Sequence, residues 1–249
     1  MKNLVLIGAL LSAVALHGQQ SIPNGTILPL ELKSSLNSHF AKAGQVITAR
    51  IAQDVPLPEG RIREGSKVIG HVVAVTRASD NGPADISLRF DTLLESRNKM
   101  AITTNLRALA SPMSVWDAQL PLTGPDRGSP ENTWNTVLVG DDEVAYRGGG
   151  PVAKGLEVVG EPTAGGGVLA NLSEAAGTKC HGKFQGNDRL QALWVFSSDA
   201  CGLYGLPDLT LSHAGRSNPV GEIKLASMKG EVELRSGSGI LLRVMQSTP

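Results

Sequence analysis

Two glycine runs are the first residues whose types suggest chemistry. Gly148–Gly150 followed by Ala153 has the outline of a dinucleotide-binding turn, GxGxxA. Such a turn holds a pyrophosphate only when a helix N-terminus follows it, but here Pro151 and then Lys154-Gly155 follow, without a helical pattern. Gly165–Gly167 lacks the GK[ST] ending of a phosphate-binding loop. The first run is therefore predicted to be a loop between strands, the second is not predicted to bind phosphate, and no cofactor is expected.

Serine and lysine at the spacing of a nucleophile and its base form the second candidate. Ser96 to Lys99 spells SxxK and Ser35 to Asn37 spells SxN, two motifs of serine acylases. The SxxK motif requires a helix, so that the lysine lies one turn from the serine, whereas residues 96–99 read as a turn between strands. The sequence also contains no KTG partner and no GxSxG elbow. We expect no acylase chemistry.

The residues that most often bind metals or move protons are scattered. After the N-terminal segment the chain carries His39, His71, His181 and His213, without HxH or HExxH spacing. Asp141 to Glu143 are adjacent carboxylates of the type that binds cations, but an acidic run between strands is more typical of a solvated hairpin turn. We therefore predict no catalytic, cofactor-binding or metal-binding residues, and no enzyme.

Cys180 and Cys201 are the only cysteines. In an oxidising compartment they can form one disulfide. The alternative is a zinc site that includes His181, but two cysteines and one histidine do not complete such a site and CxxC spacing is absent. Trp194 and Phe196 alternate in a predicted strand before Cys201, where core packing near a disulfide explains them better than a sugar-binding platform. The disulfide is the prediction.

The first residues predict export. Lys2 supplies a positive charge, and an apolar run extends from Leu4 to Leu16. This run is shorter than the roughly 20 residues that span a bilayer, and it fits the central region of a signal peptide. The alternative, a buried core helix, is disfavoured by the polar residues from His17 onward. We place the signal peptide at residues 1–18 and expect a mature chain without a transmembrane span, in the periplasm or cell envelope or secreted.

Composition excludes several classes of function. The 23 lysines and arginines balance 23 acidic residues, so no bulk charge favours nucleic acid or an acidic membrane surface. A hydrophobic content of 41% with 18% charged residues is typical of a folded globular protein. The 29 glycines and 14 prolines interrupt long helices and favour many short strands joined by turns.

Period-two alternation locates the strands. Ile86, Leu88 and Phe90, for example, alternate with polar residues and should face one side of a sheet. Strands are predicted at residues 26–32, 45–52, 67–76, 85–93, 100–107, 137–139, 156–159, 190–196, 208–212, 222–227, 231–235 and 240–244. Two weaker patterns, at residues 32–40 and 168–176, suggest short helices.

Short strands at this spacing predict an all-β protein, an antiparallel barrel or sandwich. Residues 109–136 lose the periodicity and are rich in proline, which predicts a linker or a long excursion. We therefore expect a β-barrel-like domain from residues 19–108 plus 217–249. Residues 109–216 would form a Gly/Pro-rich insertion, or a second small β domain, that carries the disulfide.

One series of motifs resembles a known family. The motifs are Ile22-Pro23-Asn24-Gly25-Thr26, Leu36-Asn37-Ser38, Ala49 to Val55, Gly65 to Gly70, Ile86 to Phe90 and Leu234 to Val244. Their order resembles the periplasmic β-barrel domain of TrbI-type proteins, channel components of type IV secretion and conjugal transfer. That family shows IPxGT, LNS, A-x-V-x-x-DV, GSxLIG and R-x-x-F/W elements before its last strands. Gly25, Gly65, Ser66 and Gly70 are accordingly predicted as structural turn residues.

The resemblance implies a barrel-like fold and a place in the cell envelope. It does not extend to a pore, because a cleavable signal is expected where the family carries an inner-membrane helix and a Pro-rich stalk. Residues 109–216 also contain no counterpart of the family's membrane-crossing helical pair, and Arg63-Glu64 replaces the proline that usually precedes the Gly-Ser turn.

We expect an exported, non-enzymatic structural or protein-interaction component of the cell envelope. Its partners would be other envelope proteins and not nucleic acid, and homo-oligomerisation is left open. The alternative is a secreted enzyme or a carbohydrate-binding module that uses residues 109–216. The missing catalytic motifs argue against the enzyme, and the few aromatic residues argue against sugar binding.

Overall fold

The structure is a computed structural model that describes residues 22–79, 82–96, 98–120, 135–140, 142–174, 180, 186 and 189–245. The predicted signal peptide, Asp141 and His181 lie outside these residues. The described chain is nearly all β, which confirms the predicted fold class. Its sheets form a sandwich-like arrangement, and within the described ranges they do not close into a barrel.

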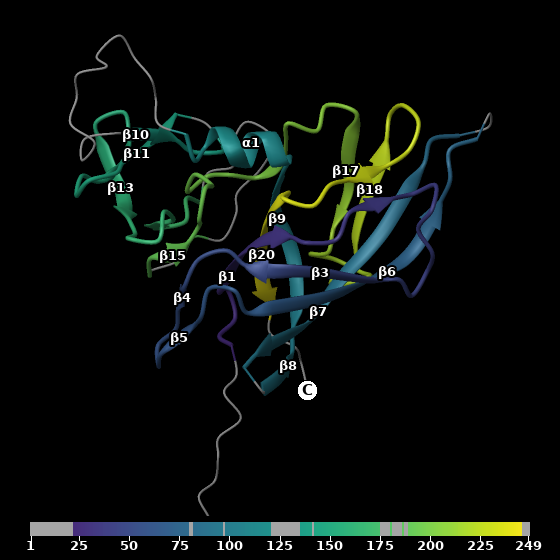
Figure 1. The fold of residues 1–249 in the computed structure, drawn as a ribbon, viewed down its shortest axis with the longest axis horizontal. Helices are drawn as coiled ribbons and strands as arrows, with labels where there is room; N and C mark the ends of the chain where they lie inside the picture. Colours follow the sequence, from purple (N-terminus) through teal and green to yellow (C-terminus); the bar gives the residue numbers. More distant parts are fainter. Residues whose placement is uncertain are drawn as a thin grey trace, which may run out of the picture.

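The largest sheet contains ten strands in the described part of the chain. They are β1 (Ile27–Leu32), β3 (Val46–Ile51), β6 (Lys67–Thr76), β7 (Asp85–Glu95), β8 (Asn98–Ala101), β9 (Thr103–Ala110), β16 (Gly202–Tyr204), β17 (Leu209–Ala214), β18 (Ile223–Ser227) and β20 (Gly239–Met245). Their order is β16-β9-β20-β1-β3-β6-β7-β18-β17, with β8 beside β7 (Figure 1). The pairs are antiparallel, except that β16 runs parallel to β9. Two short pairs accompany this sheet: β2 (Leu36–Asn37) with β19 (Glu233–Leu234), and β4 (Val55–Pro56) with β5 (Arg61–Ile62).

The concave side of the large sheet encloses the main hydrophobic core. Ile86, Leu88 and Phe90 of β7 are 0%, 3% and 1% exposed, as their alternation predicted. Gly70 of β6 lies opposite Phe90 of β7, at a point where the pairing register of the two strands shifts. A Cβ on Gly70 would lie 2.4 Å from the carbonyl oxygen of Arg89, so only glycine fits where these two strands approach so closely.

Three central strands, β1, β20 and β9, are buried on both faces. Leu242 of β20 points into the main core, while its neighbour Leu241 belongs to a second hydrophobic cluster on the outer face. Ile27 of β1 and Ala108 of β9 join Leu241 in that second cluster. Burial on both faces explains why apolar residues such as Leu241 and Leu242 follow one another directly in these strands.

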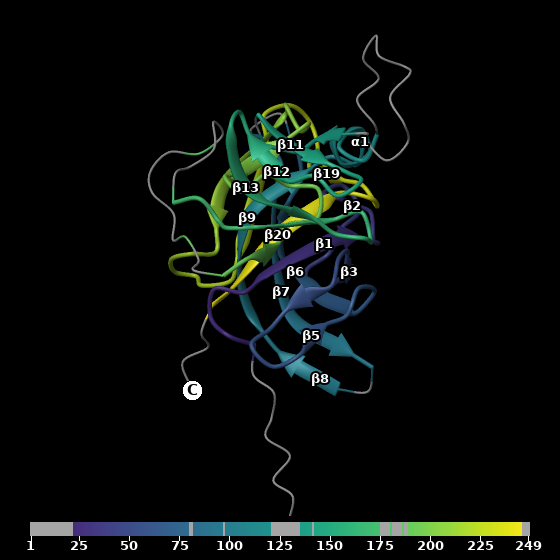
Figure 2. The same cartoon turned by 90° about the vertical axis from the view of Figure 1, so that its left-hand side faces the viewer.

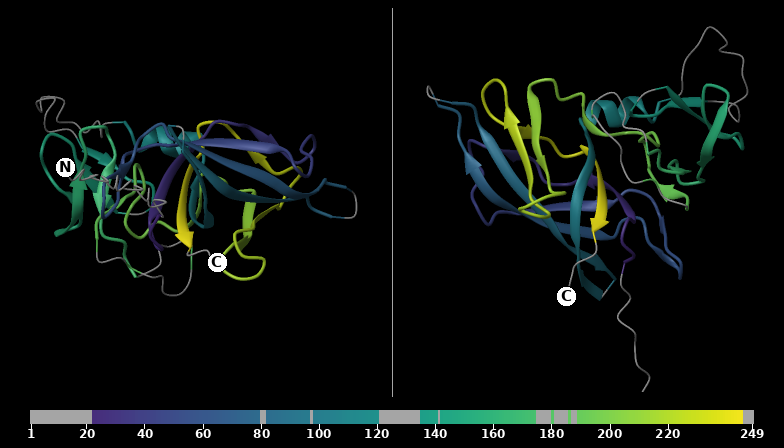
Figure 3. Two further views of the ribbon diagram at one scale, coloured as in Figure 1. Left: turned by 90° about the horizontal axis from the view of Figure 1, so that it is seen from below. Right: turned by 180° about the vertical axis from the view of Figure 1, so that it is seen from behind.

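A smaller sheet covers this outer face. Its strands are β10 (Asn135–Val137), β11 (Glu143–Tyr146), β12 (Val152–Lys154), β13 (Glu157–Pro162), β14 (Val168–Ala170) and β15 (Gln191–Ala192), paired in chain order. Figure 2 shows β11, β12 and β13 in front of β9 and β20, and Figure 3 shows the small sheet as a lobe at one end of the molecule. The second hydrophobic cluster fills the space between the two sheets, with Val152, Val168 and Phe196 from the smaller sheet and its loops.

Buried amide side chains fasten the two sheets together. Gln191 Oε1 accepts a hydrogen bond from the backbone N–H of Ile27 at 3.1 Å. Gln53, which is 4% exposed, donates from Nε2 to the carbonyl of Val168 at 3.0 Å and accepts from the N–H of Trp194 at 2.7 Å. These bonds satisfy backbone groups that burial would otherwise leave unpaired.

The helix predictions at residues 32–40 and 168–176 were wrong. Residues 36–37 and 168–170 form strands, and the one α-helix of the described residues is α1 (Pro112–Asp117), within the predicted linker. Ser111 caps α1 by accepting a hydrogen bond from Ser114 N at 3.1 Å, and Pro112 occupies the first turn. Local capping therefore made a helix where no periodicity was visible. No helix in the described residues is long and apolar enough to cross a membrane.

The predicted strand at 190–196 is also shorter than expected. Only Gln191–Ala192 is strand; residues 194–195 form a turn, and Phe196 makes an isolated bridge to Val139. Trp194 adopts a φ of +56°, a left-handed conformation that is strained for a bulky residue. Its buried side chain belongs to the second hydrophobic cluster, and its bonded N–H and packed ring hold this strained turn in place.

Candidate functional site

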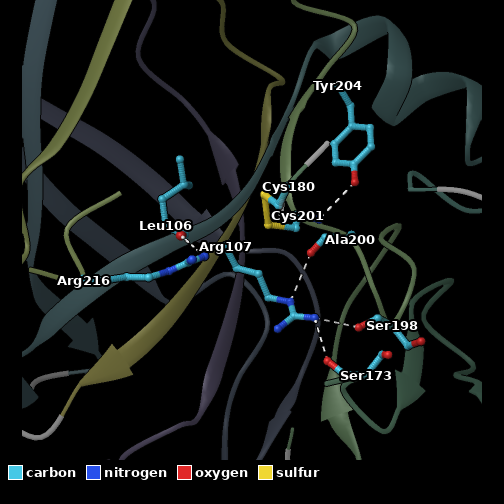
Figure 4. Close-up of a disulfide and its surroundings, with 9 residues drawn as sticks. All are labelled: Leu106, Arg107, Ser173, Cys180, Ser198, Ala200, Cys201, Tyr204 and Arg216. Atoms are coloured by element: carbon cyan, nitrogen blue, oxygen red, sulfur yellow. Dashed lines mark hydrogen bonds between the residues drawn. A yellow bond between two sulfur atoms is a disulfide. The ribbon is translucent and has the colours of Figure 1, made fainter. Parts of the chain in front are cut away.

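The predicted disulfide is present. Cys180 and Cys201 are joined with a Cα–Cα distance of 5.8 Å, within the usual range for disulfides. Cys201 is fully buried and directly precedes β16, so the bridge fixes the segment that enters the large sheet. Figure 4 shows the bridge between the large sheet and the loop that contains Ser198 and Ala200.

A buried arginine holds the chain around the disulfide. Arg107 of β9 is 3% exposed, and it donates from Nε to the carbonyl of Ala200 at 3.1 Å and from its terminal nitrogen to the carbonyl of Ser198 at 2.9 Å (Figure 4). Burial, followed by the positive charges of Arg243 and Arg216, lowers the pKa of Arg107 to about 10. The guanidinium therefore remains charged at neutral pH, and its charge strengthens these hydrogen bonds.

Tyr204 completes this anchor from β16. Its hydroxyl oxygen accepts a hydrogen bond from the backbone N–H of Cys201 at 2.9 Å. The carbonyl of Tyr204 accepts from the N–H of Ser111, the cap of α1. The disulfide, Arg107 and Tyr204 thus make the start of β16 a rigid edge of the large sheet.

The large sheet is open between β16 and β17. These strands are its two ends, and no hydrogen-bonded pairing joins them in the described residues, although only the turn of residues 205–208 separates them in the chain. A hollow of about 650 Å³ is lined by both strands, this turn and Cys180. We call this hollow the edge groove. Its apolar lining consists of Leu203, Leu206, Pro207, Leu209 and Leu211.

Backbone groups of β17 face the edge groove. The carbonyl of Asp208 accepts from Met228 N at 2.7 Å, so residue 208 faces the side of β18. Leu209 N instead donates to the carbonyl of Leu206 at 3.2 Å, on the opposite side. Because backbone directions alternate along a strand, the N–H and C=O of Leu211 also point away from β18. The edge groove therefore combines partly buried leucines with the outward hydrogen-bonding groups of an edge strand.

Arg216, which is not among the residues lining the edge groove, links the segment after β17 to β9. Arg216 follows β17, and its terminal nitrogen donates to the carbonyl of Leu106 in β9 at 3.4 Å (Figure 4). This bond spans the opening from the β17 side to the β9 side. A register shift between Leu211 and His213 also ends the regular pairing of β17. The accessible edge is therefore short, about Leu209 to Leu211.

The residues predicted at turns fall into two groups. Gly25 and Gly65 occupy turns with φ of +85° and +82°, conformations that favour glycine, and Ser66 follows the second of these turns. Gly70 lies inside β6 and not in a turn. The prediction of a turn at Gly70 was wrong: the close approach of β6 and β7 is what requires glycine there.

The histidines of the described residues lie apart, and each has a local partner. His71 Nδ1 lies 2.9 Å from a carboxylate oxygen of Asp91, His213 Nδ1 lies 2.6 Å from the carbonyl of Glu222, and His39 faces Glu231. No group of three metal-binding side chains occurs in the described part of the chain.

Glu143 does not lie in a solvated turn, as was predicted for residues 141–143, of which Asp141 is outside the described residues. Asp142 is exposed, but Glu143 is fully buried in β11. Its carboxylate accepts hydrogen bonds from the backbone N–H of Ser198 at 2.8 Å and from the Ser198 hydroxyl at 2.5 Å. Burial raises the pKa of Glu143, although the bonds from Ser198 oppose that shift. This role could not be predicted from local sequence, because Ser198 is 55 residues away.

Comparisons with known proteins identify no relative. No protein-family model matches the chain. No curated protein matches it at significant similarity either.

Proposed function

We propose that this protein is an exported, non-enzymatic structural component of the cell envelope that binds other proteins by strand addition at the edge groove. The observation that carries the proposal is the open side of the large sheet between β16 and β17, lined by apolar side chains. We further propose that the large sheet corresponds to the barrel domain of TrbI-type channel proteins, which assemble with other envelope proteins.

Strand addition would give hydrogen-bond partners to the outward backbone groups of β17 and would cover the apolar lining of the groove. An extended segment bound beside β17 would pair with the outward N–H and C=O of Leu211, and its side chains would cover Leu203 and Leu206. Exposed sheet edges are templates for such pairing, and proteins normally cover or shorten them. A groove of this length would select a short segment with alternating apolar residues.

The disulfide supports two parts of the proposal, export to an oxidising compartment and a preformed sheet edge at the groove. Disulfides persist in oxidising compartments such as the bacterial periplasm, in agreement with a signal peptide at residues 1–18. Cys180 also lines the edge groove, and Cys201 leads into β16. A preformed, rigid edge costs less entropy on binding than a flexible one.

The test is photo-crosslinking in the native host followed by mass spectrometry. A benzophenone amino acid at Thr210, an exposed residue that lines the edge groove, should crosslink to an envelope protein through an extended segment. The same probe at Phe40, which is 75% exposed and lies outside the lining of the groove, is the matched control. Leu206→Glu should abolish the Thr210 crosslink, because the new charge would be desolvated by the partner. A crosslink that is unchanged by Leu206→Glu, or equal at both positions, would rule the proposal out.

A further inference from the structure

The two glycine runs of the sequence meet in the fold. One lies in the turn between β11 and β12 and the other in the turn between β13 and β14. These strands pair antiparallel in chain order, so both turns come to the same end of the small sheet; Figure 2 labels its strands β11, β12 and β13. Together they line a hollow of about 730 Å³, which we call the glycine pocket.

Arg147 is a largely buried cation in the glycine pocket. It is 9% exposed, and it donates from Nε to Thr136 Oγ1 at 3.2 Å and from its terminal nitrogen Nη1 to the carbonyl of Gly167 at 3.0 Å. Both partners are neutral, and Arg147 makes no ion pair in the described residues. Burying a charge without an opposite charge is costly, so an anion in this pocket would be stabilised.

The walls of the pocket leave backbone exposed. Gly149 and Gly166 have φ of +98° and +88°, and a Cβ on either would meet no atom within 4 Å. Gly150 and Gly160 are instead required by packing, because a Cβ would lie 2.6 Å from the Tyr146 Cβ and 2.2 Å from the Leu169 carbonyl. The pocket is thus kept open by residues that cannot carry side chains.

The other residues that line the glycine pocket indicate which chemical group would accompany the anion. Pro151, Pro162 and Val158 are apolar, and Val158 is 66% exposed. Glu161 is also exposed and lines the pocket, so it would repel an anion with several charges. A single negative charge beside a small apolar group fits this combination better than a phosphate does.

We propose that the glycine pocket binds a carboxylate attached to a small apolar group, with Arg147 as the carboxylate ligand. The planar guanidinium matches a carboxylate, and the pair is stronger where water is excluded. Two sources share this chemistry, the C-terminal residue of a peptide and a free short-chain acid. This site is separate from the edge groove and does not depend on strand addition there.

The test is titration of the exported protein, followed by two-dimensional amide NMR and calorimetry. The probes are N-acetyl-Ala-Ala with a free carboxylate, the same peptide as its C-terminal amide, and isobutyrate. The free-acid peptide should shift the amide signals of Gly149 and Gly166 and bind at least about tenfold more tightly than the amide. Equal binding of isobutyrate and the peptide would assign the free acid as the source, and tighter binding of the peptide would assign a C-terminus. Equal binding of acid and amide, or binding of no probe, overturns the proposal.

Variants separate the pocket from general effects. Arg147→Gln should weaken binding of the free-acid peptide at least about tenfold. Since Arg147 also contacts Gly167, two rim variants are tested in parallel: Glu161→Gln should tighten binding about two- to fivefold, and Val158→Glu should weaken it. Leu156→Glu, at a fully exposed position outside the lining of the pocket, should change nothing. If both rim variants bind like the unchanged protein, the pocket is not the site.

Discussion

Glu143 and Ser198 form a buried hydrogen-bonded pair that joins the small sheet to the loop before the disulfide. Both carboxylate oxygens of Glu143 are used, one by the N–H of Ser198 at 2.8 Å and one by its hydroxyl at 2.5 Å. Next to it, Asp199 accepts from Lys154 Nζ at 2.5 Å and from the Ser197 hydroxyl at 2.8 Å. This network and Arg107 hold the same loop from opposite sides.

The raised pKa of Glu143 predicts a pH-dependent stability. Burial is the main cause of the shift, so the folded state binds a proton more readily than the unfolded state does. The stabilisation from Glu143 is therefore fully present below the unfolded pKa and is lost as pH rises through the raised folded pKa.

Glu143→Gln removes this titration. The melting temperature of the unchanged protein, relative to that of Glu143→Gln, should fall as pH rises from about 4 to 8. Thermal melts of both proteins across this range measure it. Glu157→Gln, at an exposed position, is the control and should show a constant difference. A constant difference for Glu143→Gln as well would contradict the role of burial.

Removal of the Gln53 side-chain amide is expected to lower the unfolding free energy strongly. Gln53→Ala would leave the N–H of Trp194 and the carbonyl of Val168 without their partner, at a cost of about 2–5 kcal/mol of unfolding free energy. Urea denaturation provides the measurement. Gln45→Ala removes only an exposed bond to the N–H of Lys42 and should cost less than about 0.5 kcal/mol. Similar losses in the two variants would show that Gln53 does not join the sheets.

A substitution at Leu88 tests which face of β7 is buried. Leu88→Asp places an unpaired charge in the main core, where the leucine is 3% exposed, and should cost more than about 3 kcal/mol. Val46→Asp, at a 53% exposed position in β3 of the same sheet, should remain within about 1 kcal/mol of the unchanged protein. Chemical denaturation of the two variants measures the contrast. Equal stability of Leu88→Asp and the parent would mean that β7 faces the other way.

The strands of the large sheet with one buried and one more polar face, such as β3, β6 and β18, were well predicted from their alternation. The predicted strand at residues 67–76 has the same bounds as β6, and the alternation of Ile86, Leu88 and Phe90 gave the buried face of β7. The small sheet was harder. β11, β12 and β14 have only three or four residues each, too few for a period to be visible.

The residues that hold the candidate sites were not predictable for a different reason. Arg107 and Gln53 bond to main-chain groups 66 to 141 residues away, and one backbone carbonyl looks like any other in a sequence. The edge groove follows from which strands end the sheet, a property of topology and not of local pattern. The run Gly148–Gly150 was correctly predicted to be a loop between strands, but its meeting with Gly165–Gly167 depends on the pairing of β11 to β14.

The disulfide and the signal peptide are tested together by mass spectrometry of the exported protein. The mature chain should lack about the first 18 residues, and its two cysteines should resist alkylation until reductant is added.

The bridge closes a loop with a sequence separation of 21, so Cys180→Ala/Cys201→Ala should lose about 3 kcal/mol of stability. Hydrogen exchange should then increase most at β16, which follows Cys201, while β6 and β7 stay protected because their core lies elsewhere. An intact Met1, or thiols that alkylate without reductant, would contradict export with oxidation. Uniform loss of protection across β6, β7 and β16 would show that the bridge supports the whole fold and not this edge.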